Sequence, residues 1–187
     1  MRFSPVAACL LACLAACSRP DPSPDRYKDD KYLFSFIPPK GWTVTTHSTP
    51  ACLTSVEAVQ GECRLYVCVS ERPKEFLPTS SDFANCELVK TYVEEKLKGY
   101  NVRCRPSLIQ GRRVYDAIYL RNVADVTGKV RLQLVRQAFL ARDRLLYTLT
   151  AYTFGESEQA LKDASMPCDD AVLRSEASFF LSPVPKR

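Results

Sequence analysis

The fold is decided by the stretch Phe34-Ser35-Phe36-Ile37-Pro38-Pro39-Lys40-Gly41-Trp42. Residues 33–37 have the composition of a short β-strand, and the two prolines must end it because proline cannot donate a hydrogen bond to a neighbouring strand. A second strand then begins at Gly41-Trp42-Thr43-Val44. We expect Trp42 to be a core or rim aromatic at this strand rather than a ligand platform.

Two further β segments follow, at residues 52–58 and 63–69. If they are joined by the three-residue loop Val59-Gln60-Gly61, Cys52 lies opposite Cys68 and the two can form a disulfide. A two-residue turn at Gln60-Gly61 would shift the register and remove this match.

A helical pattern begins at Asp82, which can cap the helix, and Gly99 is placed to end it in the left-handed conformation. The apolar residues of this segment recur every three or four positions: Phe83, Cys86, Val89, Val93 and Leu97. The next segment alternates apolar residues at Tyr100, Val102 and Cys104. Three longer β runs are predicted after it, at residues 113–120, 130–140 and 145–152.

The last segment is predicted to be helical from Ser157, to be interrupted at Pro167 and to restart at Asp169. The order of elements is therefore strands, helix, strands, helix, with connections of hairpin length and no βαβ alternation. This order predicts one antiparallel α+β domain over residues 32–187.

Residues 34–42 resemble the F-x-F-x-x-P-x-G-W opening of the Mog1/PsbP-like fold. The resemblance continues in the late hairpin ending Leu146-Tyr147-Thr148-Leu149-Thr150 and in the closing segment Ser175-Glu176-Ala177-Ser178-Phe179-Phe180. It implies a central antiparallel sheet flanked by two main helices, as in a bacterial lipoprotein with a Mog1/PsbP-like (DcrB-like) domain. Members of this group mostly bind proteins, so the resemblance implies a protein partner.

The N-terminus has the pattern of an export signal. Arg2 precedes an apolar run over residues 6–16 that is too short to span a bilayer. Leu14-Ala15-Ala16-Cys17 resembles a lipobox, which implies a signal peptide over residues 1–16 and acylation of Cys17, palmitate included. Lipidation at Cys13 and an ordinary signal peptide with an incidental cysteine are the alternatives.

Residues 17–31 then read as the lipidated cysteine followed by a proline-rich tether. By the same resemblance, Ser18 after the cysteine implies the outer membrane, with the domain lipid-anchored and facing the periplasm.

Export would leave six cysteines besides Cys17. An even number in an exported protein favours three disulfides, for which 15 connectivities are possible. Two bridges with two free thiols are the first alternative, and a metal site is the second. The metal site is disfavoured because the cysteines lack C-x2-C spacing and His47 is the single histidine. The disulfide candidates are Cys52, Cys63, Cys68, Cys86, Cys104 and Cys168.

Basic residues are concentrated in the second half of the chain. The formal net charge is +5, and residues 99–155 hold ten basic against three acidic residues. Because side chains alternate along a strand, Val130, Leu132 and Leu134 should face the core while Arg131 and Gln133 face outward. A solvated sheet surface is the alternative to a binding patch. The candidate partner-binding residues are Arg113, Arg121, Arg131 and Arg136.

Such a patch would attract an acidic protein, anionic lipid or anionic glycan, whereas nucleic acid is not expected in the periplasm. No G-x-S-x-G motif and no phosphate-binding glycine loop is present. His47 lies in a stretch rich in threonine and serine, but it has no neighbouring acid or nucleophile in a recognised catalytic arrangement. We therefore expect no cofactor, no metal and no catalytic residue.

The sequence favours a non-enzymatic lipoprotein that serves as a binding or accessory module of an envelope assembly or secretion system. An immunity or inhibitor lipoprotein that neutralises a toxin and a structural envelope component are the alternatives.

Overall fold

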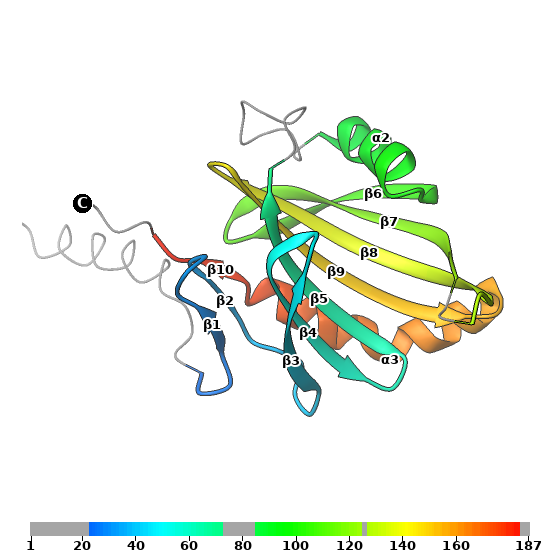
Figure 1. The fold of residues 1–187 in the computed structure, drawn as a ribbon, viewed down its shortest axis with the longest axis horizontal. Helices are drawn as coiled ribbons and strands as arrows, with labels where there is room; N and C mark the ends of the chain where they lie inside the picture. Colours follow the sequence, from blue (N-terminus) through cyan, green and yellow to red (C-terminus); the bar gives the residue numbers. More distant parts are fainter. Residues whose placement is uncertain (1–22, 73–84, 125–126, 184–187) are drawn as a thin grey trace, which may run out of the picture.

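The structure is a computed structural model, and it describes residues 23–72, 85–124 and 127–183. Its centre is a seven-stranded antiparallel sheet with strand order β3-β4-β5-β9-β8-β7-β6 (Figure 1). The strands are β3 (Thr43–Thr49), β4 (Cys52–Gln60), β5 (Cys63–Glu71), β6 (Tyr100–Ile109), β7 (Arg112–Ala124), β8 (Val130–Arg142) and β9 (Leu145–Gly155). The predicted α+β class with a central antiparallel sheet is confirmed.

A second, smaller sheet has the strand order β1-β2-β10, with β1 at Tyr27–Asp29, β2 at Phe34–Phe36 and β10 at Phe180–Leu181. It brings the two ends of the domain together. Arg26 is buried and donates from Nη1 to the backbone oxygen of Ser178 at 2.9 Å. The folded part of the chain therefore extends into the predicted tether, and the boundary placed at residue 32 lies too late.

Two helices lie within the described ranges, on opposite faces of the large sheet. Helix α2 (Cys86–Lys96) packs on β6 and β7, whereas α3 (Glu158–Ala177) runs behind β9 and β5 (Figure 1). Each helix covers its own apolar core. The α3 core includes Phe34, Phe36, Tyr147, Leu149, Val172 and Phe179. Trp42 is half-buried and packs against this core, as predicted. The α2 core includes Val89, Val93, Tyr119, Val135 and Phe139.

The ends of α2 differ from the prediction. Its N-cap is Asn85, which accepts a hydrogen bond from the Glu87 backbone N–H at 2.9 Å, and the expected cap Asp82 lies outside the described residues. The left-handed residue after the helix is Lys98, with φ of 57°, and not Gly99. Glycine is needed next to it for space, because a Cβ there would lie 2.5 Å from a ring carbon of Tyr119.

The predicted interruption of the last helix is wrong, because α3 continues through Pro167. A proline inside a helix costs about 3 kcal/mol through a lost hydrogen bond and a steric clash. Packing against the sheet offsets this cost, and the adjacent Cys168 is bonded to Cys63 of β5.

The β4–β5 hairpin has the predicted disulfide but not the predicted register. Its loop is the two-residue Gly61-Glu62, and Ser55 rather than Cys52 lies opposite Cys68. Cys52 lies beyond the part of β4 that pairs with β5, and its Cα is 5.7 Å from that of Cys68 in the disulfide. The Cys52–Cys68 pairing is confirmed, whereas the register argument for it is wrong.

The remaining candidate cysteines form two further disulfides. Cys63–Cys168 joins β5 to α3, with Cα atoms 5.9 Å apart, and Cys86–Cys104 joins α2 to β6, with Cα atoms 5.8 Å apart. All six predicted cysteines are thus paired, and each of the two helices has a covalent bond to the sheet.

Candidate functional site

Within the described part of the chain, the two faces of the seven-stranded sheet differ in how much of each a helix covers. We call the face under α3 the closed face, and the other, which α2 covers mainly at β6 and β7, the open face. Because side chains alternate along each strand, neighbouring residues of β8 lie on different faces. Ala138 and Leu140 belong to the α3 core, whereas Val135 and Phe139 belong to the α2 core.

This alternation separates the predicted arginine patch. Arg136 lies on the closed face, where it contacts Glu176 of α3, while Arg131 lies on the open face beside Phe154. Arg121 also lies on the open face, bonded to Gln133. Arg113 belongs to β7, but its side chain is not among those that the structure describes.

The burial predicted for β8 is wrong at two positions. Gln133 was expected to face solvent and is only 2% exposed, whereas Val130 was expected in the core and is 61% exposed. The alternation itself is correct. Burial differs because Gln133 lies at the floor of a groove, and Val130 lies at the very start of the strand.

Arg136 is part of a buried ion network that joins β7, β8 and α3. Its Nη2 lies 2.8 Å from Asp116 Oδ2 and 2.5 Å from Glu176 Oε2, and its side chain is 11% exposed. Arg105 of β6 also donates to Asp116 Oδ2, at 3.2 Å. Burial raises the pKa of Glu176 to about 7, against the opposing charge of Arg136. Such a network holds α3 in place.

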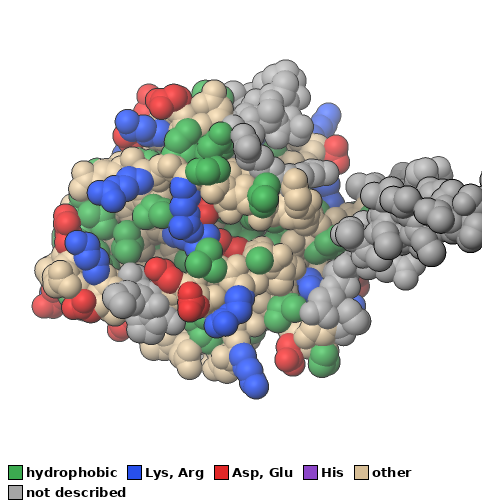
Figure 2. All heavy atoms as spheres, turned by 180° about the vertical axis from the view of Figure 1, so that it is seen from behind, with side chains coloured by type: hydrophobic (Ala, Val, Ile, Leu, Met, Phe, Trp, Pro, Cys, Tyr) green, Lys and Arg blue, Asp and Glu red, His purple; other side chains and the backbone are tan. Residues whose placement is uncertain are grey.

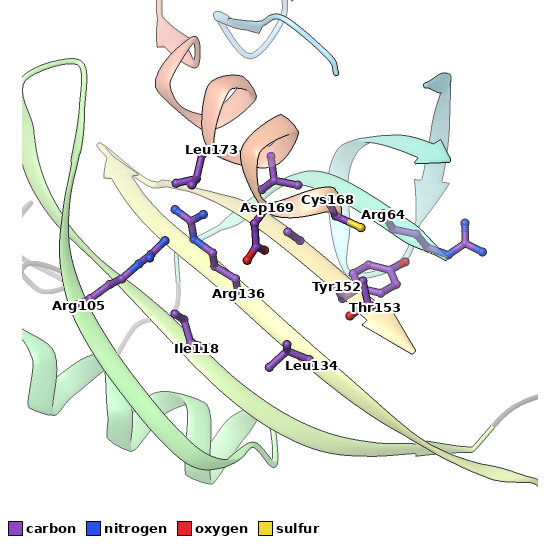
Figure 3. Close-up of a pocket in the computed structure, with 12 residues that line it drawn as sticks. Arg64, Arg105, Ile118, Leu134, Arg136, Tyr152, Thr153, Cys168, Asp169 and Leu173 are labelled. Atoms are coloured by element: carbon purple, nitrogen blue, oxygen red, sulfur yellow. The ribbon is translucent and has the colours of Figure 1, made fainter. Parts of the chain in front are cut away.

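A small cleft of about 120 Å³ lies between α3 and this network. Arg105 and Arg136 converge below Leu173, while Arg64 points away from them (Figure 3). Since both converging arginines are paired with Asp116, they offer an anion little uncompensated charge. On the same side of the molecule, basic side chains are scattered among acidic and hydrophobic ones rather than gathered in one patch (Figure 2).

A second hollow, of about 870 Å³, lies between the Pro38–Trp42 segment and the C-terminal half of α3. Its serines are already bonded to the protein. Ser175 Oγ donates to the Ile37 carbonyl at 2.5 Å, and Ser178 Oγ accepts from the Ile37 N–H at 2.7 Å. These hydroxyls fasten α3 to the segment after β2.

The open face contains a groove of about 560 Å³ over β5, β9, β8 and β7, bordered by α2. Its position follows from alternation, because residues 146, 148, 150, 152 and 154 of β9 all point to this face. Four half-buried aromatic rings line the groove: Tyr66, Tyr92, Tyr152 and Phe154. Polar side chains form much of its floor: Arg121, Gln133, Gln137, Thr148 and Thr150.

Hydrogen bonds fix the aromatic rings of the groove. Tyr119 donates to Gln137 Oε1 and Tyr152 donates to Glu57 Oε1, each at 3.0 Å, while the Tyr66 hydroxyl lies 3.4 Å from Cys52 Sγ. Burial raises the pKa of Tyr119 and of Tyr152 to about 12, so both hydroxyls stay protonated as donors at neutral pH. The groove is therefore built before any ligand arrives.

Several buried polar groups in the groove have unused hydrogen-bonding capacity. Gln133 and Gln137 are 2% and 9% exposed, and each uses its side-chain oxygen to accept from Arg121 and Tyr119, respectively. Within the described residues, their amide N–H groups have no acceptor and the 8% exposed Thr150 hydroxyl has no partner. These three groups are not among the fully enclosed atoms that lack a partner, so water or a ligand in the groove can reach them.

His47 has a carboxylate neighbour that sequence reasoning missed, because strand pairing brings Glu57 close to it. His47 Nε2 lies 3.4 Å from Glu57 Oε2 and 2.9 Å from Thr45 Oγ1. A nucleophile–base–acid relay needs its two partners on opposite ring nitrogens, and here both meet the same nitrogen. This arrangement is an exposed polar cluster at the β3 edge.

The described ranges contain neither a metal cluster nor a membrane-spanning helix. No three His, Cys, Asp or Glu side chains come together there in a way that could hold a metal ion. Neither of the helices in those ranges is long and apolar enough to cross a bilayer.

Sequence reasoning also missed the groove. Its floor combines residues of four strands, and the polar members, such as Gln137 and Thr148, have the pattern of a solvent-facing strand side. The available signal was the run Thr148, Thr150, Tyr152 and Phe154, in which hydroxyl and aromatic side chains share one face of β9.

Comparison with known proteins gives information at the level of fold. The chain matches no protein-family model, and no curated protein matches its sequence. Among solved structures, the PsbP protein CyanoP of Synechocystis is similar with a TM-score of 0.50 and 20% identity, over 83% of this chain and 91% of that one. LpqN of Mycobacterium tuberculosis, described as involved in cell envelope biogenesis, has a TM-score of 0.50 and 12% identity, over 88% and 90%.

The Ran-binding protein Mog1p of Saccharomyces cerevisiae is similar with a TM-score of 0.53 and 12% identity, over 83% of this chain and 94% of that one. Likeness at such identities concerns the arrangement of strands and helices alone. The sequence resemblance at residues 34–42 and these three structures agree: the domain has the Mog1/PsbP-like fold.

Proposed function

We propose that this protein is a non-enzymatic binding module of the bacterial envelope, lipid-anchored at the outer membrane, facing the periplasm, and accessory to an assembly or secretion system. The observation that carries the proposal is the groove on the open face, whose buried polar groups are not all used by the fold. LpqN, which shares the fold, is described as involved in envelope biogenesis, and Mog1p as Ran-binding. The description of LpqN supports a role in the envelope, and that of Mog1p supports a binding role.

Anchoring rests on Cys17, which lies outside the described residues. Three disulfides support an exported protein, because such bridges persist in oxidising compartments. Residues 18–26 could span at most about 30 Å between the lipid and β1. Cys17→Ser should abolish incorporation of labelled palmitate, and retained label on this variant would reject the anchor.

The partner expected from the charge distribution is an acidic protein, and we place its contact at Arg131 on the rim of the groove. Arg131 lies 5.0 Å above the ring of Phe154, and its Nη2 is 3.5 Å from Glu62 on the β4–β5 loop. Its side chain is 34% exposed, which leaves the guanidinium accessible. Attraction of this kind weakens as salt rises.

The test is affinity capture of the full chain after crosslinking in cells, with Arg131→Glu compared with Arg174→Glu. Arg174 is an exposed residue of α3, on the other side of the molecule. We expect Arg131→Glu to lose the partner while Arg174→Glu and the wild type retain it at low salt. Equal capture by the two variants would contradict a contact at the rim.

A further inference from the structure

We propose that the floor of the open-face groove binds an uncharged, hydroxyl-rich sugar chain. The inference deepens the proposed function and rests on the open face being the binding surface. It concerns a different ligand class from the protein partner placed at the rim. Three properties of the floor support it: its unused donors, its fixed aromatic rings and its low charge.

The first property is the set of unused donors. The side-chain oxygens of Gln133 and Gln137 each already accept one hydrogen bond, from Arg121 and Tyr119, so both glutamines offer the groove chiefly their N–H donors. The Thr150 hydroxyl, 8% exposed, adds a group that can donate or accept. A sugar hydroxyl can rotate to accept from an amide and donate to a threonine, which matches this set.

The second property is the aromatic lining. Tyr66, Tyr152 and Phe154 are half-buried along the groove, and Tyr152 and Phe154 meet edge to face with ring centroids 5.6 Å apart. A sugar ring has faces of C–H groups that pack on aromatic carbon while its hydroxyls point sideways. The bond from Tyr152 to Glu57 holds this ring in place before binding, which lowers the entropy lost on association.

The third property is charge. Of the described residues that line the groove, Arg121 alone carries a full charge, and its Nε is bonded to Gln133. The described lining therefore carries a single positive charge, whose guanidinium N–H groups a neutral ligand can meet with hydroxyl oxygens.

The same donor set disfavours a peptide. The backbone N–H and C=O groups beneath the groove belong to the ladders of β5, β9 and β8, so a peptide could not add to the sheet there. Its own N–H groups would need acceptors, and each glutamine oxygen of the floor already accepts one of the two hydrogen bonds that it can take. The volume of about 560 Å³ lies in the range of small-ligand sites.

The test is calorimetric titration of the purified full chain, in a detergent without a sugar head group, with maltotetraose, cellotetraose and tetra-N-acetylchitotetraose. We expect at least one of them to bind with an affinity that salt leaves unchanged. We also expect it to shift the side-chain amide NMR signals of Gln133 and Gln137. Thr150→Val should weaken binding about fivefold to tenfold, since it removes one hydrogen-bonding group without changing side-chain shape.

The matched control is Thr153→Val, on the same strand but the closed face, where the hydroxyl is buried without a partner among the described residues. It should bind as the wild type does. The proposal is overturned if the folded protein binds none of the three sugars, if peptides bind in their place, if both threonine variants weaken binding equally, or if salt abolishes it. Failed titration with intact, Arg131-dependent partner capture would remove this inference and leave the proposed function standing.

Discussion

The closed and open faces of the sheet are built from alternating residues of the same strands, yet they use their polar side chains differently. On the closed face Arg136, Asp116 and Glu176 bind one another, and the oxygens that they leave unpaired, Asp116 Oδ1 and Glu176 Oε1, are enclosed by protein. On the open face Gln133 and Gln137 are just as buried, but each keeps a donor that no described protein group accepts.

This difference indicates which buried polar groups are structural. A buried group whose partners come from several elements, such as Arg136 between β7 and α3, holds those elements together. A buried residue whose unused donor or acceptor faces a groove is available for binding. The number of arginines in a segment does not show whether they serve the fold or binding. Arg131 and Arg136 are five residues apart in one strand, yet they lie on opposite faces.

The largest expected effect concerns the covalent bond of each helix to the sheet. Cys63–Cys168 on the closed face closes a loop of 105 residues, whereas Cys86–Cys104, which joins α2 to β6, closes one of 18. If a disulfide acts by restricting the unfolded chain, removing the first costs about 5 kcal/mol and removing the second about 3 kcal/mol. Chemical denaturation of the double Cys→Ser variants measures both values, and equal losses would show that loop length does not govern them.

The next largest effect is expected from Arg136→Met. The substitution leaves Asp116 and Glu176 buried without their main cationic partner, which should lower the free energy of unfolding by about 3–5 kcal/mol. The control is Arg131→Met on the open face, where loss of a partly exposed ion pair with Glu62 should cost less than about 1 kcal/mol. Comparable melting temperatures for the two variants would contradict the division between the faces.

Much of this architecture could be predicted from the sequence. The strands from Thr43 onward and the amphipathic segment of α2 follow from apolar periodicity. The pairing of Cys52 with Cys68 is also as predicted, but the three-residue loop from which it was argued is not the loop of the hairpin. Local patterns of this kind describe which residues share a face of one element.

The errors arose where distant contacts override local preference. Pro167 does not end α3, because the sheet and the Cys63–Cys168 disulfide hold the helix on both sides of it. Gly99 is needed because a side chain there would clash with the ring of Tyr119, which lies twenty residues further along the chain. Strand β1 was taken for tether, because three residues carry too little periodicity to be recognised.

The groove could not be predicted from the sequence for a related reason. An alternating polar side of a strand has the same pattern whether water or a ligand covers it. Only the arrangement of β5, β9, β8 and β7 around α2 shows that Gln133 lies at the bottom of a concave surface.

The smallest effect expected in this comparison is a pH dependence carried by Glu176 alone. Burial raises its pKa from 4.5 to about 7; Asp116 of β7 adds to the rise, while Arg136 of β8 and Arg105 of β6 oppose it. Between these two pH values the folded protein keeps a proton that the unfolded chain releases. The stabilisation is therefore complete below pH 4.5 and is lost as the pH rises through about 7, by on the order of 3 kcal/mol. Urea unfolding at several pH values should show this slope in the wild type and a flatter one in Glu176→Gln. The same decline in both proteins would assign it to other groups, whereas a flat profile in the variant would locate the titration at the junction of α3 with the closed face.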